Sequence, residues 1–134
     1  MFRFLEKYKI PLVFVPLGLY WVLLLVLTSL PAENLPDVSF SDKVEHLLAF
    51  CVLAVLLKLT LLLQNKNVNV KKRSSLFTIV IVGIYAGLDE IHQIFIPSRT
   101  GDIVDWIADI SGALIAVLLL GLILKYFSPK SEFS

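Results

Sequence analysis

Four long runs of apolar residues dominate the sequence, and short polar segments separate them. The runs cover residues 9–30, 42–64, 76–96 and 102–125. Each run is close to the ~20 residues that an α-helix needs to cross the hydrocarbon core of a bilayer. The pattern therefore predicts an all-α polytopic membrane protein, a four-transmembrane-helix bundle.

Composition agrees with this prediction. Of the 134 residues, 57% are hydrophobic, whereas soluble domains average about 45–50% apolar residues. Such long apolar runs cannot be hidden inside so short a chain, and they leave no room for a separate soluble domain. We expect a single membrane domain over residues 1–134.

The first run has an alternative interpretation as a signal peptide, because Arg3, Lys7 and Lys9 precede it. However, the run is longer than an ordinary signal-peptide core. Leu30 also stands where a small residue is expected before cleavage after Ala32. We interpret the run as a retained helix.

Prolines and capping residues mark the helix ends. Pro16 lies inside the first run and should bend that helix, whereas Pro31 and Pro97 should end the first and third helices. Ser41 and Asp42 are both suitable N-cap residues for the second helix.

The basic residues predict the orientation. Ten of the 12 lysines and arginines lie on one side if both termini are cytoplasmic, which satisfies the positive-inside rule. These ten are Arg3, Lys7, Lys9, Lys58, Lys66, Lys71, Lys72, Arg73, Lys125 and Lys130. Lys58 belongs to this group only if its side chain extends toward the cytoplasmic interface. On the outer side remain Arg99 and Lys43, and we interpret Lys43 as an interfacial anchor.

The acidic residues gather at the other ends of the helices. Seven carboxylates lie there: Asp42, Glu45, Asp89, Glu90, Asp102, Asp105 and Asp109. His46, His92, Gln93 and Arg99 lie among them. At about 100° per residue, Asp42 shares a helix face with His46, and Asp89 shares one with Gln93. Asp105 and Asp109 likewise lie on one face of the last helix, which Gly112 and Ala116 continue.

Helical rise places His46, Asp89 and Asp109 at a similar depth, about 6–11 Å below the outer ends of their helices. Charges at that depth are costly unless they face the bundle interior or water. We therefore expect one outward-facing acidic pocket, with Arg99 neutralising at least one carboxylate. Glu45 and Asp102 are interpreted as solvated helix ends, and Tyr85 as either a donor to Asp89 or a packing residue.

These residues resemble a known family. Asp42-Lys43-x-x-His46, Asp89-Glu90-x-x-Gln93, Pro97-x-Arg99 and Asp105-x3-Asp109-x-x-Gly112 occur in the order seen in VanZ-like membrane proteins. The resemblance implies a small multi-pass protein of the bacterial cytoplasmic membrane. The family's founding member is associated with low-level resistance to teicoplanin, without a change in the peptidoglycan precursor terminus.

The polar residues allow several kinds of chemistry. We assign hypothetical catalytic roles to His46, Asp89 and Asp105, and substrate-binding roles to Asp42, Glu90, Gln93, Arg99 and Asp109. The hypothesis is action at the outer leaflet on a cell-envelope or lipid-linked component, with enzymatic activity left open. A divalent cation is a candidate cofactor, although the sequence does not define its ligands.

Two alternatives remain open from the sequence: an ion- or proton-coupled transporter, and a non-catalytic bundle that organises envelope proteins. The sequence has no P-loop, GxGxxG or HExxH motif. We expect the lipid bilayer as a partner and no nucleic acid, because topology accounts for the basic residues. Cys51 is the single cysteine, so the chain forms no internal disulfide.

Overall fold

The computed structural model describes residues 2–35 and 41–127. Four helices are long and apolar enough to cross a membrane, as predicted. They comprise Ile10–Ser29 (the π-helical η1, Ile10–Phe14, followed by α2, Val15–Ser29), α3 (Asp42–Leu63), α5 (Ser74–Gln93) and α6 (Ile103–Phe127). The shorter helices are α1 (Phe2–Lys7), η2 (Ala32–Asn34) and α4 (Val68–Lys72). The described residues contain no strand, so the all-α prediction is confirmed.

The start of the first membrane helix accommodates two prolines. Pro16 has no N–H group to donate to the preceding turn. The chain forms the π-helical turn η1 just before it, in which the N–H of Val15 donates to the carbonyl of Ile10. The expected disturbance at Pro16 therefore takes the form of a widened turn.

The third membrane helix ends earlier than predicted. α5 ends at Gln93, and residues 94–98 form turns before Arg99. A proline disfavours the helical conformation of the residue before it, so Pro97 makes continuation costly. Ser98 then has φ of 62°, in the left-handed region, and reverses the chain toward α6.

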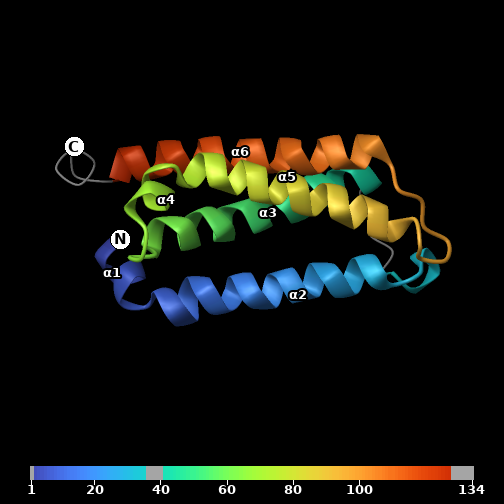
Figure 1. Ribbon diagram of the computed structural model, residues 1–134, viewed down its shortest axis with the longest axis horizontal. Helices are drawn as coiled ribbons and strands as arrows, with labels where there is room; N and C mark the ends of the chain where they lie inside the picture. The colour runs from blue at the N-terminus through green and yellow to red at the C-terminus, as the bar shows by residue number, and fades with distance from the viewer. Residues whose placement is uncertain (1, 36–40, 128–134) are drawn as a thin grey trace.

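The helices α3, α5 and α6 form the tightest part of the bundle, and α3 with α6 makes the most extensive interface. The helix α2 packs against α3 and α5 (Figure 1). Both described ends of the chain lie at the same end of the bundle as α4 (Figure 1). The segments after α2 and between α5 and α6 lie at the opposite end, which we call the loop end.

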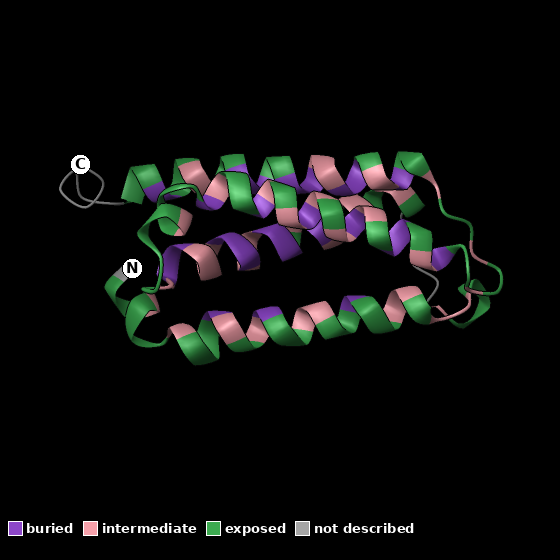
Figure 2. Ribbon diagram, viewed as in Figure 1, coloured by how far each residue is buried: buried purple, intermediate pink, exposed green. Residues whose placement is uncertain are grey.

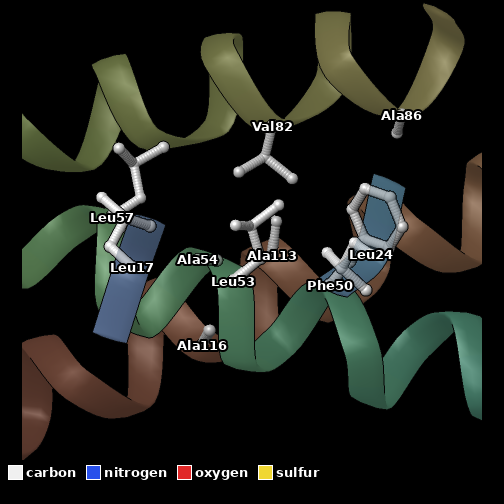
Figure 3. Close-up of a cluster of buried hydrophobic side chains, with 10 residues drawn as sticks. All are labelled: Leu17, Leu24, Phe50, Leu53, Ala54, Leu57, Val82, Ala86, Ala113 and Ala116. Carbon is white, nitrogen blue, oxygen red and sulfur yellow. The ribbon is translucent and has the colours of Figure 1, made fainter. Parts of the chain in front are cut away.

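Burial follows the pattern of a membrane bundle. Leu53, Ala54, Val82 and Ala86 are completely buried and belong to one apolar core, which Figure 3 shows. The outward faces of the same helices expose many large apolar side chains, and the ribbon is largely green on these faces in Figure 2. A bilayer accepts such faces because the helices satisfy their own backbone hydrogen bonds.

The α3–α6 interface depends on a glycine. A Cβ atom at Gly112 would collide with the backbone carbonyl of Leu47 and lie 3.1 Å from the amide nitrogen of Cys51. Ala116, one turn further along α6, is 2% exposed. Small residues therefore bring the backbones of α3 and α6 into direct contact just below the acidic residues, as the sequence stripe predicted.

Candidate functional site

The polar side chains of α3, α5 and α6 converge at the loop end, and most of them are buried. Asp89 is 2% exposed, Glu90 7%, Asp105 5% and Asp109 0%. The expected pocket open to the outside is thus a packed interface in the described residues. Three groups of side chains make up this polar cluster.

The first group, which we call the histidine group, centres on His46. Its Nδ1 atom lies 2.9 Å from Asp109 Oδ1 and 3.8 Å from Glu90 Oε1. Its Nε2 atom faces Asp42 Oδ1 at 3.9 Å. Because these residues come from α3, α5 and α6, all three tightly packed helices meet at one imidazole.

The second group, which we call the lysine bridge, joins α3 to the start of α6. Lys43 Nζ donates to Asp105 Oδ1 (2.5 Å) and to Asp102 Oδ2 (2.9 Å). The bond from Lys43, followed by one from the backbone N–H of Val104, holds the pKa of Asp102, which precedes α6, below its ordinary range. Lys43 is therefore the central cation of the cluster and not a simple interfacial anchor.

The third group, which we call the amide chain, runs from Asp89 to the end of α2. Gln93 Nε2 donates to Asp89 Oδ2 (3.1 Å), and Arg99 Nη1 donates to Gln93 Oε1 (3.4 Å). The remaining donors of Arg99 reach the carbonyls of Leu30 (3.2 Å) and Leu27 (2.9 Å).

The expectation that Arg99 neutralises a carboxylate is therefore wrong for the described residues. Arg99 forms no ion pair within 4.0 Å in that part of the chain, and it reaches Asp89 only through Gln93. The last carbonyls of a helix have no partner inside the helix. The carbonyls of Leu27 and Leu30 at the end of α2 bind the guanidinium instead. Lys43 neutralises the carboxylates, as was expected of Arg99.

The three groups are connected. The backbone N–H of Asp102 donates to Glu90 Oε2 at 2.8 Å, which links the histidine group to the lysine bridge. Gly101 makes this contact possible, because its Cα position lies against the carbonyl of Glu90 and a Cβ there would approach it to 2.6 Å. Asp89 directly precedes Glu90 on α5, so the amide chain continues from the same turn.

Several buried polar atoms in the cluster have no hydrogen-bond partner. They are Asp89 Oδ1, Glu90 Oε1 and Asp109 Oδ2 among the carboxylates, and the hydroxyl of Tyr85 nearby. The bond from Tyr85 to Asp89 that the sequence allowed is thus not formed. Tyr85 packs instead, with ring centroids 5.2 Å from Trp21 and 5.9 Å from Phe50. Buried polar groups without partners are rare in native proteins and call for an explanation.

A second polar level lies toward the other end of the bundle. Lys58 is 4% exposed, and its Nζ donates to the carbonyl of Val117 (2.8 Å). The expectation that Lys58 extends to the interface is wrong, because its side chain crosses to α6. Helical rise puts it about 18 Å along α3 from His46. The apolar core, including Leu53 and Val82, lies between the two levels.

A shallow hollow of about 220 Å³ borders the cluster between α5 and α6. It is lined by Gly87, Glu90, Ile91, Ile94, Gly101, Asp102, Ile103 and Trp106. Glu90 and Asp102 line this hollow next to apolar side chains.

The sequence predicted which residue types gather at the loop end, but not which side chains contact one another there. It grouped Asp42 with His46 and Asp89 with Gln93, and both pairs are neighbours. It placed Glu90 on the flank, whereas Glu90 contacts both His46 and the Asp102 amide. The signal for Lys43 was available, because Lys43 and His46 are three residues apart on the same helix and face together.

Two sets of side chains in the cluster are close enough to share a metal ion. One comprises His46, Glu90 and Asp109, and the other Asp42, His46 and Asp105; in each, one ligand atom per residue lies within 4.8 Å of the others. His46 belongs to both sets. In the second set Asp105 is already bonded to Lys43, so the first set has the freer ligands.

The fold and the cluster define a class of protein: a multi-pass helical membrane protein with a buried polar centre at one end of the bundle. The family model VanZ/LLP1 matches residues 26–124, which include the polar cluster and the last three membrane helices. The chain belongs to this VanZ-like family.

A curated relative is known from the fission yeast Schizosaccharomyces pombe and is described as an uncharacterised protein. It is 30% identical over 104 residues, which are 77% of this chain and 60% of the relative. The chain thus spans about 60% of the length of the curated relative it matches. No solved structure matches the chain significantly.

Proposed function

We propose that this VanZ-like protein binds a lipid or lipid-linked component of the cell envelope at the outer leaflet, through the polar cluster. The observation that supports this proposal is that the polar side chains gather at one end of the bundle. The carboxylates, His46 and Lys43 meet at the loop end, whereas a closed apolar core fills the middle of the membrane region.

The proposed orientation places the loop end outside and both termini inside a bacterial cytoplasmic membrane. The basic residues support it, because ten of the 12 would lie toward the cytoplasm. Lys58 is one of the ten only by position, since its side chain is buried. Single cysteines can test the orientation in a Cys51→Ala background. Positions 33 and 98 should react from outside intact cells, and position 69 only after permeabilisation.

The hollow beside Glu90 is the proposed approach for the bound molecule. Its apolar lining from α5 and α6 suits a lipid chain, and Glu90 with Asp102 provides the polar contacts at one edge. His46, Asp89 and Asp105 remain the proposed acid–base groups. Of the proposed binding residues, Glu90 is the one that borders both the hollow and the histidine group.

Transport across the membrane is the second candidate, and buried Lys58 is the observation that favours it. A buried cation inside a membrane helix often marks an ion path. Against transport, fully buried Leu53, Ala54 and Val82 separate Lys58 from His46. Uptake of protons or ions into proteoliposomes would support transport and contradict the main proposal.

The experiment that tests the proposal is native mass spectrometry of the purified full-length chain. A retained lipid or lipid-linked molecule should be lost in Glu90→Gln and kept in Glu33→Gln, which changes an exposed acid outside the cluster. The same variants should be compared for teicoplanin sensitivity in a bacterial host, because the proposed link to glycopeptides rests on family membership. Folded cluster variants that retain the same lipids and leave sensitivity unchanged would contradict the proposal and favour an envelope-organising bundle.

A further inference from the structure

We infer that His46, Glu90 and Asp109 form a binding site for a divalent transition-metal ion of the Zn²⁺ or Mn²⁺ class. The inference deepens the proposed function, on which it rests for its biological role. The binding itself requires no lipid-linked substrate.

The first argument is geometric. Two ligand atoms that are each about 2.1 Å from one metal ion lie about 3.0–3.4 Å apart. His46 Nδ1 and Asp109 Oδ1 are 2.9 Å apart, and Glu90 Oε1 is 3.8 Å from the same nitrogen. A small rotation of the Glu90 side chain therefore completes a three-residue site with one ligand from each of three helices.

The second argument is that a buried ligand atom faces the site without another partner. Glu90 Oε1 lies 3.8 Å from His46 Nδ1 and accepts no hydrogen bond within the described residues. Glu90 is 7% exposed, and the Asp109 side chain is completely buried, with its Oδ2 also lacking a partner in that part of the chain. A bound cation would satisfy Glu90 Oε1, whose desolvation otherwise costs free energy.

The third argument is charge balance. With a neutral imidazole, the two carboxylates of Glu90 and Asp109 carry two negative charges in a buried part of a membrane protein. The nearest lysine, Lys43, is already bonded to Asp102 and Asp105. The guanidinium of Arg99 is bonded to carbonyls of α2 and to Gln93. A divalent cation neutralises the pair without a further protein cation.

A neighbouring group already orients one of the ligands. The N–H of Asp102 holds Glu90 Oε2 at 2.8 Å, which directs the other oxygen of Glu90 toward His46. Asp42 Oδ1 faces the second nitrogen of His46 at 3.9 Å, longer than a hydrogen bond. A carboxylate that moves to hydrogen-bond distance of this nitrogen would orient a metal-binding imidazole and raise its basicity.

The ligand set indicates the kind of ion. One imidazole and two carboxylates suit Zn²⁺ or Mn²⁺, whereas Mg²⁺ and Ca²⁺ prefer oxygen ligands alone. Three protein ligands also leave coordination positions for water or for an oxygen of a bound headgroup.

The test uses the full-length protein in nanodiscs, stripped with EDTA and then dialysed against ZnCl₂ or MnCl₂. Elemental analysis should find stoichiometric Zn²⁺ or Mn²⁺ in the wild type and in Glu33→Gln. Affinity should fall by at least about tenfold in Glu90→Gln and Asp109→Asn, which lose a charged ligand. Equal binding by Asp109→Asn and the wild type would overturn the assigned site, and tighter binding of Mg²⁺ or Ca²⁺ would overturn the ion class.

Thermal unfolding gives a second readout, and its comparison of the wild type with and without metal needs no variant. The preferred ion should raise the Tm of the wild type above its value in EDTA, and it should leave Asp109→Asn unchanged. In EDTA, Asp109→Asn should be at least as stable as the wild type, because the amide removes an uncompensated charge. An identical wild-type Tm with EDTA, ZnCl₂ and MnCl₂, together with no retained ion, would overturn the inference.

Lipid retention on the same samples separates the two proposals. Metal binding without any retained lipid would contradict the proposed function and leave the cation site standing. Retained lipid without metal binding would contradict the cation site and leave the proposed function standing.

Discussion

The ammonium group of Lys43 lies 2.5 Å from a carboxylate oxygen of Asp105, whose side chain is only 7% exposed. Lys43 also reaches Asp102 at 2.9 Å, so one lysine of α3 fixes the start of α6. The buried partner makes this pair different from a surface ion pair, which contributes little. If Lys43 were lost, the charge of Asp105 would remain in a place where water cannot solvate it.

We therefore expect Lys43→Met to lower the Tm of the purified protein by about 5 °C or more. The double variant Lys43→Met/Asp105→Asn should recover most of this loss, because the unpaired charge is gone. Differential scanning fluorimetry in one detergent measures the wild type, Lys43→Met, Asp105→Asn and the double variant. Additive effects of the two single changes would contradict the pairing.

Asp102 gives a pH-dependent prediction. The hydrogen bond from Lys43 lowers the pKa of Asp102 below its ordinary value of 3.8. A lowered pKa in the folded state means that the stabilisation is complete above the unfolded-state pKa and is lost as the pH falls through the folded-state pKa. Asp102→Asn should thus be less stable than the wild type at neutral pH, and the difference should shrink as the pH falls below 3.8, the ordinary pKa of this carboxyl group. A constant difference across that range would show that Asp102 acts through packing alone.

Much of the fold could be predicted because membrane helices follow simple rules of length and polarity. The pattern gave the four spans to within three residues at each end, and the largest error lies at α5, where the chain leaves the helix well before Pro97. Helical periodicity also grouped Asp42 with His46 and Asp89 with Gln93, since both pairs are four residues apart on one helix.

Contacts between side chains of different helices could not be predicted in the same way. Periodicity gives the face of a residue, but not the rotation of one helix against another. The sequence favoured Arg99 over Lys43 as the cation that neutralises the acids, and the outcome depended on how the carbonyls of Leu27 and Leu30 meet the loop before α6. The burial of Lys58 likewise depends on the space above Gly121, where a Cβ would lie 3.5 Å from the lysine nitrogen.

Gly112 tests the close contact of α3 and α6. A methyl group at this position would collide with the carbonyl of Leu47, and the α3 backbone cannot yield as a flexible side chain can. We expect Gly112→Ala to lower the free energy of unfolding by about 1–3 kcal/mol, as overpacking typically does. The matched control is Gly18→Ala, where the added Cβ meets nothing within 4 Å. Equal stability of the two variants in an SDS-unfolding titration would contradict direct backbone contact.

Substitution of Lys58 tests the buried polar contact between α3 and α6 in the half of the bundle away from the loop end. Its ammonium has the carbonyl of Val117 as its hydrogen-bond partner in the described residues, and no carboxylate lies within 4.0 Å. Methionine has a similar length without the charge, so Lys58→Met should raise the free energy of unfolding by about 1–2 kcal/mol. Lys58→Ala should be less stable than Lys58→Met, because it leaves a cavity beside Gly121. A loss of stability in Lys58→Met would show that the charge itself holds α3 to α6.

Arg99 tests the attachment of the first membrane helix. Its guanidinium bonds to the carbonyl of Leu27 in the last turn of α2, to the carbonyl of the C-cap residue Leu30, and to Gln93 on α5. Since α2 has the smallest interfaces among the membrane helices, this tie contributes strongly to holding its end in place. A planar guanidinium can serve three acceptors at once, whereas a lysine ammonium cannot keep the same fork geometry.

Hydrogen exchange should therefore accelerate by about tenfold over residues 24–35 in Arg99→Gln, because a hydrogen bond to a charged donor contributes about 1.5–3 kcal/mol. Arg99→Lys should fall between Arg99→Gln and the wild type. Arg73→Gln, which changes an exposed arginine at the opposite end, serves as the control and should leave exchange in this segment unchanged. If instead Arg99→Gln left residues 24–35 protected and destabilised α6, the guanidinium would act on the carboxylates and not on α2.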